Sequence, residues 1–367
     1  MKIGQITHYG SLSNYGALLQ AYALQRALKE LGHEVVLLRA SFSFHNILRK
    51  WYCAPWRVWR AWRARRAEWA AEKKHPRRFA AFAAQYMTIS EREFHSLRDL
   101  QKAGIEADAL VTGSDQVWSS KKPFPPYFLA FGPAEARRFS YAASVGSKAR
   151  MDREYLANFR EMLTPFSGIS VRESEALQQC RAAGVEQAEL VPDPVMLFPP
   201  ETWREVFDLP TESGRGKYCL IYTVGHNPIG MMPELAGHCR ENGWQLIVVP
   251  AQYQSTLQTD TAEVCYPDVP GFLSLIDQAE LVVTDSFHGT VFSLLFNTPF
   301  VVIPKNRHDA RFITLDEYFD LSRVYYRGDL AGCLAGRPDF AAVNSKMASL
   351  RRTGWDFLRR ATAGAEQ

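Results

Sequence analysis

The chain lacks the features that mark several large classes of protein. Its 367 residues contain no uninterrupted run of about 18 apolar residues, so we expect no membrane-spanning helix. Its six cysteines are scattered and form no C-x-x-C pair, which argues against a disulfide framework and a zinc site. The opening residues MKIGQITHYG do not resemble a secretory signal peptide. We therefore expect a cytoplasmic protein that needs no metal and no bound cofactor.

Positive charge is concentrated in one segment. The net charge is +4, yet residues 49–78 hold eleven Arg or Lys against two Glu. Three or four tryptophans of this segment share one face of a helix, next to its arginines. Such a helix suits the surface of an anionic membrane, but an ordinary surface helix with its Trp stripe on the core has the same pattern. A single basic segment without a binding motif argues against nucleic acid as a partner.

Predicted strands and helices alternate along the chain. Residues 2–7 form a predicted strand, a helix follows, and a second strand covers 33–40, which makes a βαβ unit with a parallel sheet. Strands and helices alternate again after the basic segment, and once more from residue 218. One of the strands predicted after the basic segment spans 188–198. We expect an α/β protein of two Rossmann-like, doubly wound domains that face a central cleft. The predicted parts are an N-terminal domain over 1–200 with a basic helical insert at 49–85, a C-terminal domain over 214–335 joined to it by a linker at 208–217, and a final helix over 340–364.

The stretch LVVTDSFHGTVFSLLF, residues 281–296, carries the strongest candidate site. A buried strand is predicted at its start and an apolar helix at its end. The start of a helix offers free amides and partial positive charge to a phosphate or carboxylate. His288 would then titrate beside a bound anion and transfer a proton near neutral pH. The alternative is that His288 only supports the start of the helix. Asp285 either orients His288 or caps the helix. The candidate donor-binding residues are Ser286, Phe287, Gly289 and Thr290.

A second candidate is Arg172, at the end of a predicted strand. A guanidinium group binds carboxylate or phosphate through paired hydrogen bonds. The alternative is a structural salt bridge to Glu173 or Glu175. Asp193, between two prolines, is interpreted as a turn residue.

Two loops supply candidates for binding an acceptor. In VTGSDQVW, Ser114 and Asp115 follow a predicted strand, and Asp115 either takes a proton from a hydroxyl group or caps a turn. Trp118 is either a platform for a sugar ring or part of the core. In the first loop the candidates are Asn14, Tyr15 and Gly16, with helix capping as the alternative.

These motifs together resemble the polysaccharide pyruvyl transferase family. The resemblance rests on KIGQITHYGSLSNYGALLQAYALQRALKELGHEV, VTGSDQVW, SYAASVG, SVRES, PDPVMLF and GFLSLIDQAELVVTDSFHGTVFSLLFNTPFVVI, in this order. It implies a fold of the glycosyltransferase-B kind and transfer of a pyruvyl group from phosphoenolpyruvate to two sugar hydroxyls.

The same resemblance implies roles for single residues. His288 matches the family's functional His-Gly next to phosphoenolpyruvate, and Arg172 matches the arginine that pairs with this anionic donor. Better-studied members have a further arginine where this chain has Ser286. Our hypothesis is that Arg311 supplies the missing charge, with Arg307 or Lys305 as alternatives. For the first loop, the family pattern favours ligand contact over capping.

We therefore expect a catalytic set of His288, Arg172 and Asp115, with phosphoenolpyruvate as co-substrate. The acceptor is a sugar or lipid-linked oligosaccharide in the synthesis of an exopolysaccharide or the cell envelope. The basic segment would bring the enzyme to the inner face of the cytoplasmic membrane. Two alternatives stay open. One is a glycosyltransferase that uses a nucleotide sugar, whose base and ribose would bind in the second domain around YTVGHNP, residues 222–228. The other is a non-catalytic binding protein of glycan assembly.

Overall fold

The computed structural model describes residues 1–9, 14–42, 75–210, 214–224, 230–250, 262–303 and 309–363. Within them the chain divides into two compact units. The first comprises residues 1–12, 17–197 and 352–367, and the second comprises residues 13–16 and 198–351. The break therefore comes just before Phe198, ahead of the predicted linker. Most of the basic insert, residues 49–74, lies outside the described residues.

The described part of the first unit is built on a parallel five-stranded sheet in the order β3-β2-β1-β4-β5. These strands are β1 (Lys2–Ile6), β2 (Glu34–Ala40), β3 (Ile89–Phe94), β4 (Ala109–Thr112) and β5 (Arg137–Ser140). The neighbouring strands β1 and β4 are buried at every residue except Lys2, and Gly4 pairs with both Val36 and Leu110. Helix α1 (Tyr15–Glu30) connects β1 to β2, and Gly32 follows it with a left-handed φ of 84°. Such a backbone angle favours glycine and stops the helix.

The described part of the first unit also contains helices and a second, smaller sheet. Its helices are α4 (His75–Tyr86), α5 (Leu97–Lys102), α6 (Arg153–Leu163) and α7 (Ser174–Ala182), with the short turns η1 (Pro125–Phe128) and η2 (Pro194–Leu197). A small sheet pairs β6 (Ser170–Val171) with β7 (Glu189–Leu190). The single strand predicted at 188–198 is therefore wrong: β7 stops at Leu190. Prolines 192 and 194 follow it, and proline cannot donate to a strand ladder.

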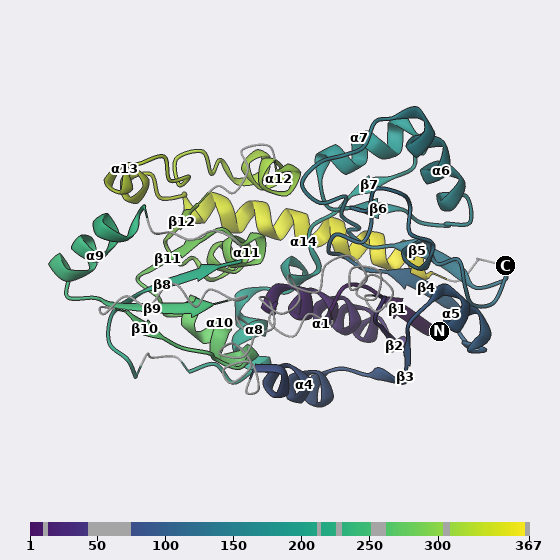
Figure 1. The fold of residues 1–367 in the computed structure, drawn as a ribbon, viewed down its shortest axis with the longest axis horizontal. Coiled ribbons are helices and arrows are strands. Elements are labelled where there is room, and N and C mark those ends of the chain that lie inside the picture. The colour runs from purple at the N-terminus through teal and green to yellow at the C-terminus, as the bar shows by residue number, and fades with distance from the viewer. Residues whose placement is uncertain are drawn as a thin grey trace, which may run out of the picture. The chain divides into compact units, whose positions relative to one another are not determined.

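The described part of the second unit repeats the plan with a parallel sheet in the order β10-β9-β8-β11-β12. Its strands are β8 (Tyr218–Thr223), β9 (Gln245–Pro250), β10 (Glu263–Val264), β11 (Leu281–Thr284) and β12 (Phe300–Val302). Figure 1 shows β8, β9 and β11 side by side in this unit. The helices are α8 (Pro200–Val206), α9 (Met232–Glu241), α10 (Val269–Asp277), α11 (Phe287–Phe296), α12 (Ala310–Phe319) and α13 (Leu330–Ala335).

The last helix, α14 (Phe340–Thr362), contributes residues to both units. In the first unit its end packs on the sheet, where Phe357 lies 6.1 Å from Tyr141 between ring centroids. The predicted α/β class and the two doubly wound domains are confirmed, because each unit has its own parallel sheet and helical connections.

Candidate functional site

The junction between β11 and α11 lies where the strand order of the second sheet reverses. From β8 the chain adds β9 and β10 on one side of the sheet, and β11 and β12 lie on the other. Ligands of α/β proteins bind outside the carboxyl ends of strands at such a point. Asp285 follows β11 there, and its carboxylate accepts a hydrogen bond from the amide of Val224, just after β8. Asp285 thus ties together the ends of the two strands that flank the reversal.

Ser286 is the N-cap of α11. Its side-chain oxygen accepts a hydrogen bond from the Gly289 amide at 3.2 Å, and its own amide donates to the Thr284 hydroxyl at 3.0 Å. The Thr290 hydroxyl donates back to the Ser286 carbonyl at 3.1 Å. Both predicted hydroxyl donors therefore belong to the capped first turn. This capping fixes the helix N-terminus, whose partial positive charge is directed at the reversal point.

Two glycines allow close packing around this turn. A Cβ on Gly289 would lie 2.5 Å from the Thr284 hydroxyl oxygen and 3.1 Å from the Tyr222 ring. A Cβ on Gly16, in the first turn of α1, would lie 2.2 Å from Nδ1 of His288. Only glycine fits at either position without a shift of its neighbours. The imidazole of His288 therefore packs directly on the Gly16 backbone.

His288 is in the first turn of α11 and is 7% exposed. Its ring meets the Phe287 ring edge to face, with centroids 5.2 Å apart. Tyr15, next to Gly16, is fully buried: it stacks on Phe272 at 4.1 Å, and its hydroxyl donates to the Pro267 carbonyl at 2.8 Å. Tyr15 thus packs in the core of the unit, where a sugar ring has no access to its face.

Arg311 lies at the start of α12 and forms an ion pair with the N-cap residue Asp309. Its Nε and Nη2 donate to the two carboxylate oxygens of Asp309 at 2.9 and 2.7 Å. The pair is mostly buried, with side-chain exposures of 18% and 5%. The alternatives Arg307 and Lys305 lie outside the described residues.

Arg172, in the first unit, is buried among acidic groups. Its Nη1 donates to Asp193 at 2.6 Å and to the Ser114 hydroxyl at 3.2 Å, and its Nε lies 3.4 Å from Glu173. Burial opposes its charge, but Asp193 and Glu173 more than offset this and raise the pKa of Arg172. The salt-bridge alternative accounts for these contacts. Asp193, which is interpreted from the sequence as a turn residue, is a partner of Arg172. The role of Arg172 toward the donor stays a prediction.

The candidate residues after β4 differ in burial and in hydrogen bonding. Ser114 is buried and donates to Asp193 at 2.9 Å. Asp115 has a left-handed φ of 73° and is partly exposed, and its carboxylate accepts the Gln116 amide. Trp118 is 1% exposed, stacks on Phe128 at 5.3 Å, and belongs to the hydrophobic core. The core alternative for Trp118 therefore replaces the sugar platform.

Sequence reasoning missed two side chains near Asp115. His8 follows β1, and its Nδ1 lies 3.1 Å from the hydroxyl oxygen of Tyr127 in η1. One signal was available, since His8 follows a predicted strand at the same edge of the sheet as Asp115. Tyr127 had no such signal, because η1 is a short turn inside a loop.

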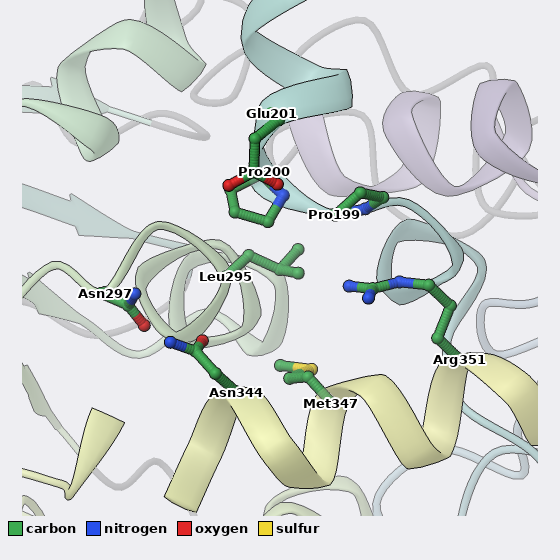
Figure 2. A pocket seen from close by; sticks show the side chains of 8 residues that line it. All are labelled: Pro199, Pro200, Glu201, Leu295, Asn297, Asn344, Met347 and Arg351. Atoms are coloured by element: carbon green, nitrogen blue, oxygen red, sulfur yellow. The ribbon is translucent and has the colours of Figure 1, made fainter. Parts of the chain in front are cut away.

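A pocket of about 290 Å³ lies at the far end of α11 from His288 (Figure 2). Leu295 and Met347 form its apolar floor, and the Arg351 side chain extends into it from α14. The remaining lining residues are Pro199, Pro200, Glu201, Asn297 and Asn344. It contains none of the predicted site residues.

Within the described ranges, no cluster of three or more His, Cys, Asp or Glu side chains could hold a metal ion. None of the helices described is both long enough and apolar enough to span a membrane.

Several solved structures of other proteins have a similar fold. UDP-GlcNAc 2-epimerase from Methanocaldococcus jannaschii is 12% identical over 99% of this chain and 100% of its own, with a TM-score of 0.55. The same enzyme in complex with UDP-GlcNAc and UDP gives a TM-score of 0.54 at 12% identity, over 99% of this chain and 100% of its own. S. aureus MnaA with UDP gives 0.50 at 10% identity, over 91% of this chain and 86% of its own. These likenesses show a glycosyltransferase-B-like fold.

Similarity in sequence is more specific. No curated protein sequence matches the chain significantly. A family profile described as polysaccharide pyruvyl transferase matches residues 14–306, which include α1, the β4 loop, Arg172 and the β11–α11 junction. The chain therefore belongs to the polysaccharide pyruvyl transferase family.

Proposed function

We propose that this protein transfers the pyruvyl group of phosphoenolpyruvate to two hydroxyls of a sugar in a polysaccharide or lipid-linked glycan. The products are a cyclic ketal and free phosphate. The observation that carries the proposal is His288 in the capped first turn of α11, at the strand reversal of the second sheet. Transfer of a pyruvyl group from phosphoenolpyruvate requires an anion-binding group and a proton-transferring group, and we assign both roles to this turn.

The reaction balances without any further reactant. A proton adds to the methylene carbon of phosphoenolpyruvate, which makes the central carbon electrophilic. One sugar hydroxyl adds to this carbon, the carbon–oxygen bond to phosphate breaks, and a second hydroxyl closes the ketal. The two sugar hydroxyls lose two protons in total. One proton is gained by the new methyl group and one by phosphate. The protein must hold two anionic groups, deliver one proton and accept others.

The second unit carries the groups that suit the donor. The amides of the first turn of α11 bind an oxyanion together with the Ser286 hydroxyl, and His288 handles the proton. Arg311 supplies positive charge once its ion pair with Asp309 is shared with the donor. We place the acceptor hydroxyls with the first unit, near Asp115. Because scattered cysteines suit a reducing compartment, we expect the reaction in the cytoplasm, at the membrane when the acceptor is lipid-linked.

Phosphate release tests the proposal. The purified protein is incubated with phosphoenolpyruvate and a panel of free methyl glycosides and lipid-linked glycans, and phosphate is measured over time. We expect acceptor-dependent release, and mass spectrometry of the product should show the added pyruvyl ketal. His288→Gln should reduce the rate by roughly 100-fold or more, as expected for loss of an acid–base group. His238→Gln, in α9 of the same unit, is the matched control.

A binding assay separates the alternatives. Thermal unfolding is followed with phosphoenolpyruvate and, in parallel, with UDP-GlcNAc. Stabilisation by phosphoenolpyruvate alone supports the proposal. Stabilisation by UDP-GlcNAc alone, with no phosphate release, would point to a sugar-nucleotide enzyme instead. A cellular function that survives in His288→Gln would point to a non-catalytic binding protein.

A further inference from the structure

The strand order of the first sheet also reverses, and titratable side chains gather there. In the order β3-β2-β1-β4-β5 the reversal lies between β1 and β4. His8 follows β1 and Asp115 follows β4. Just before them, the Thr7 hydroxyl donates to the Ser114 carbonyl and ties the two strand ends together. This edge is the expected ligand-binding position of the first unit.

The structure holds His8 in place and leaves it exposed. Its Nδ1 lies 3.1 Å from the Tyr127 hydroxyl oxygen, and the two rings have centroids 4.6 Å apart. Its backbone carbonyl accepts a hydrogen bond from Gln20 of α1 at 2.9 Å. The residue is nevertheless exposed, whereas Tyr127 is buried. His8 is thus held by its neighbours at an exposed position.

The surroundings of His8 suit a group that gains and loses a proton. Although His8 is open to solvent on one side, the protein atoms around it desolvate it and lower its pKa, while the charge of Asp115 and the backbone carbonyl of Gln116 partly oppose this. The imidazole is therefore neutral near pH 7. When it takes up a proton, the carboxylate of Asp115 and the carbonyl of Gln116 stabilise the positive charge. Desolvation and Asp115 both raise the pKa of Tyr127, so its hydroxyl stays protonated.

We propose that His8 is the general base that takes the proton from an acceptor hydroxyl, and that Asp115 stabilises the resulting imidazolium. Nδ1 keeps its hydrogen toward Tyr127, so Nε2 accepts the proton, and this choice of tautomer is part of the proposal. The hydroxyl oxygen forms its new bond to the central carbon of the pyruvyl group, and the proton leaves with phosphate. Asp115 is then a positioning residue. This inference rests on the proposed function and refines the role predicted for Asp115.

The first test measures phosphate release from phosphoenolpyruvate with methyl glycosides of galactose, glucose and mannose. His8→Gln keeps a polar side chain but cannot take up a proton, and it should lower kcat by roughly 100- to 10,000-fold. Thermal stabilisation by phosphoenolpyruvate should be unchanged, because His8 is not among the residues proposed to bind the donor. The control is His95→Gln, an exposed histidine of the same unit. If His8→Gln retained the wild-type rate while Asp115→Asn abolished it, Asp115 would be the base and the inference would be wrong.

The second test does not depend on turnover. The histidine ring signals of the wild-type protein are titrated by NMR, with His8→Gln to assign the His8 signal. We expect His8 to titrate below pH 6.5, the usual value, and Asp115→Asn to lower its pKa further. A pKa of His8 that does not respond to Asp115→Asn would overturn the pairing. Absence of phosphate release from the wild-type protein with every acceptor would instead count against the proposed function.

Discussion

The imidazole of His288 lies against the backbone of Gly16, 272 positions earlier in the sequence. A Cβ at position 16 would come within 2.4 Å of Cγ and 2.7 Å of Cβ of His288, so no side chain fits between them. The first turn of α1 thus fixes the position of the ring at the start of α11. Gly16 and His288 each lie in a motif that carries the family resemblance. Their contact explains why a glycine is required at position 16 when a histidine is present at position 288.

Gly16→Ala should displace the His288 ring. A misplacement of about 1 Å in a catalytic group can cost on the order of 100-fold in rate, and we expect a loss of this size in phosphate release. The matched control is Gly237→Ala, since a Cβ on this glycine of α9 meets nothing within 4 Å. That control should be active and slightly more stable, as alanine favours a helix over glycine. Full activity of Gly16→Ala would show that the position of the ring does not matter.

The buried pair of Arg172 and Asp193 should matter for stability. Removing one partner of a buried ion pair costs about 3–5 kcal/mol, because the other charge stays buried and uncompensated. We expect Asp193→Asn to lower the free energy of unfolding in urea by an amount of this order. Glu161→Gln, at an exposed site of the same unit, should change it little.

The same site tests the predicted donor role of Arg172. Arg172→Met removes the guanidinium group but keeps an apolar stem of similar length. If Arg172 binds the donor, the variant should lose the thermal stabilisation that phosphoenolpyruvate gives to the wild-type protein. A destabilised variant that phosphoenolpyruvate still stabilises fully would leave Arg172 with a structural role alone.

Trp118→Leu should destabilise the first unit without a specific effect on the acceptor. Truncating a buried tryptophan to alanine costs about 3–5 kcal/mol, and leucine fills part of that cavity. We therefore expect a lower melting temperature and an unchanged KM for whichever glycoside is turned over. A raised KM in a variant of normal stability would restore the sugar-platform interpretation.

Arg311→Ala should weaken binding of the donor. A hydrogen bond to a charged group contributes about 1.5–3 kcal/mol, which corresponds to roughly 10- to 150-fold in affinity for phosphoenolpyruvate. Titration calorimetry measures this directly. Arg323→Ala, at an exposed position of the same unit, is the comparison. Unchanged affinity in Arg311→Ala would remove this arginine from the donor site.

The basic segment, residues 49–78, predicts binding to anionic lipid. Flotation with vesicles that contain phosphatidylglycerol should recover the protein at low salt, and salt should weaken the recovery because exposed charges are screened. Vesicles of phosphatidylcholine alone are the control. Equal recovery with both vesicle types, or none with either, would favour packing of the tryptophans over membrane contact.

The sequence by itself determined the architecture and one site. The strand at 281–284 starts with three apolar residues and is buried on both faces, and helix α1 has leucines at helical spacing, so local patterns were sufficient. The same patterns placed Ser286 and His288 between a strand and a helix. By contrast, β3 was not predicted: its sequence ISEREF is polar, because an edge strand is largely solvent-exposed.

Only the tertiary structure decided which groups meet. Trp118 and Tyr15 could each have been exposed or buried, and burial depends on what packs above them. The partner of Arg172 is Asp193, 21 residues away, and the residue beside Nδ1 of His8 is Tyr127, 119 residues away. Spacing along the chain contains no such information, because these contacts depend on how strands and loops from distant segments come together at one edge of a sheet.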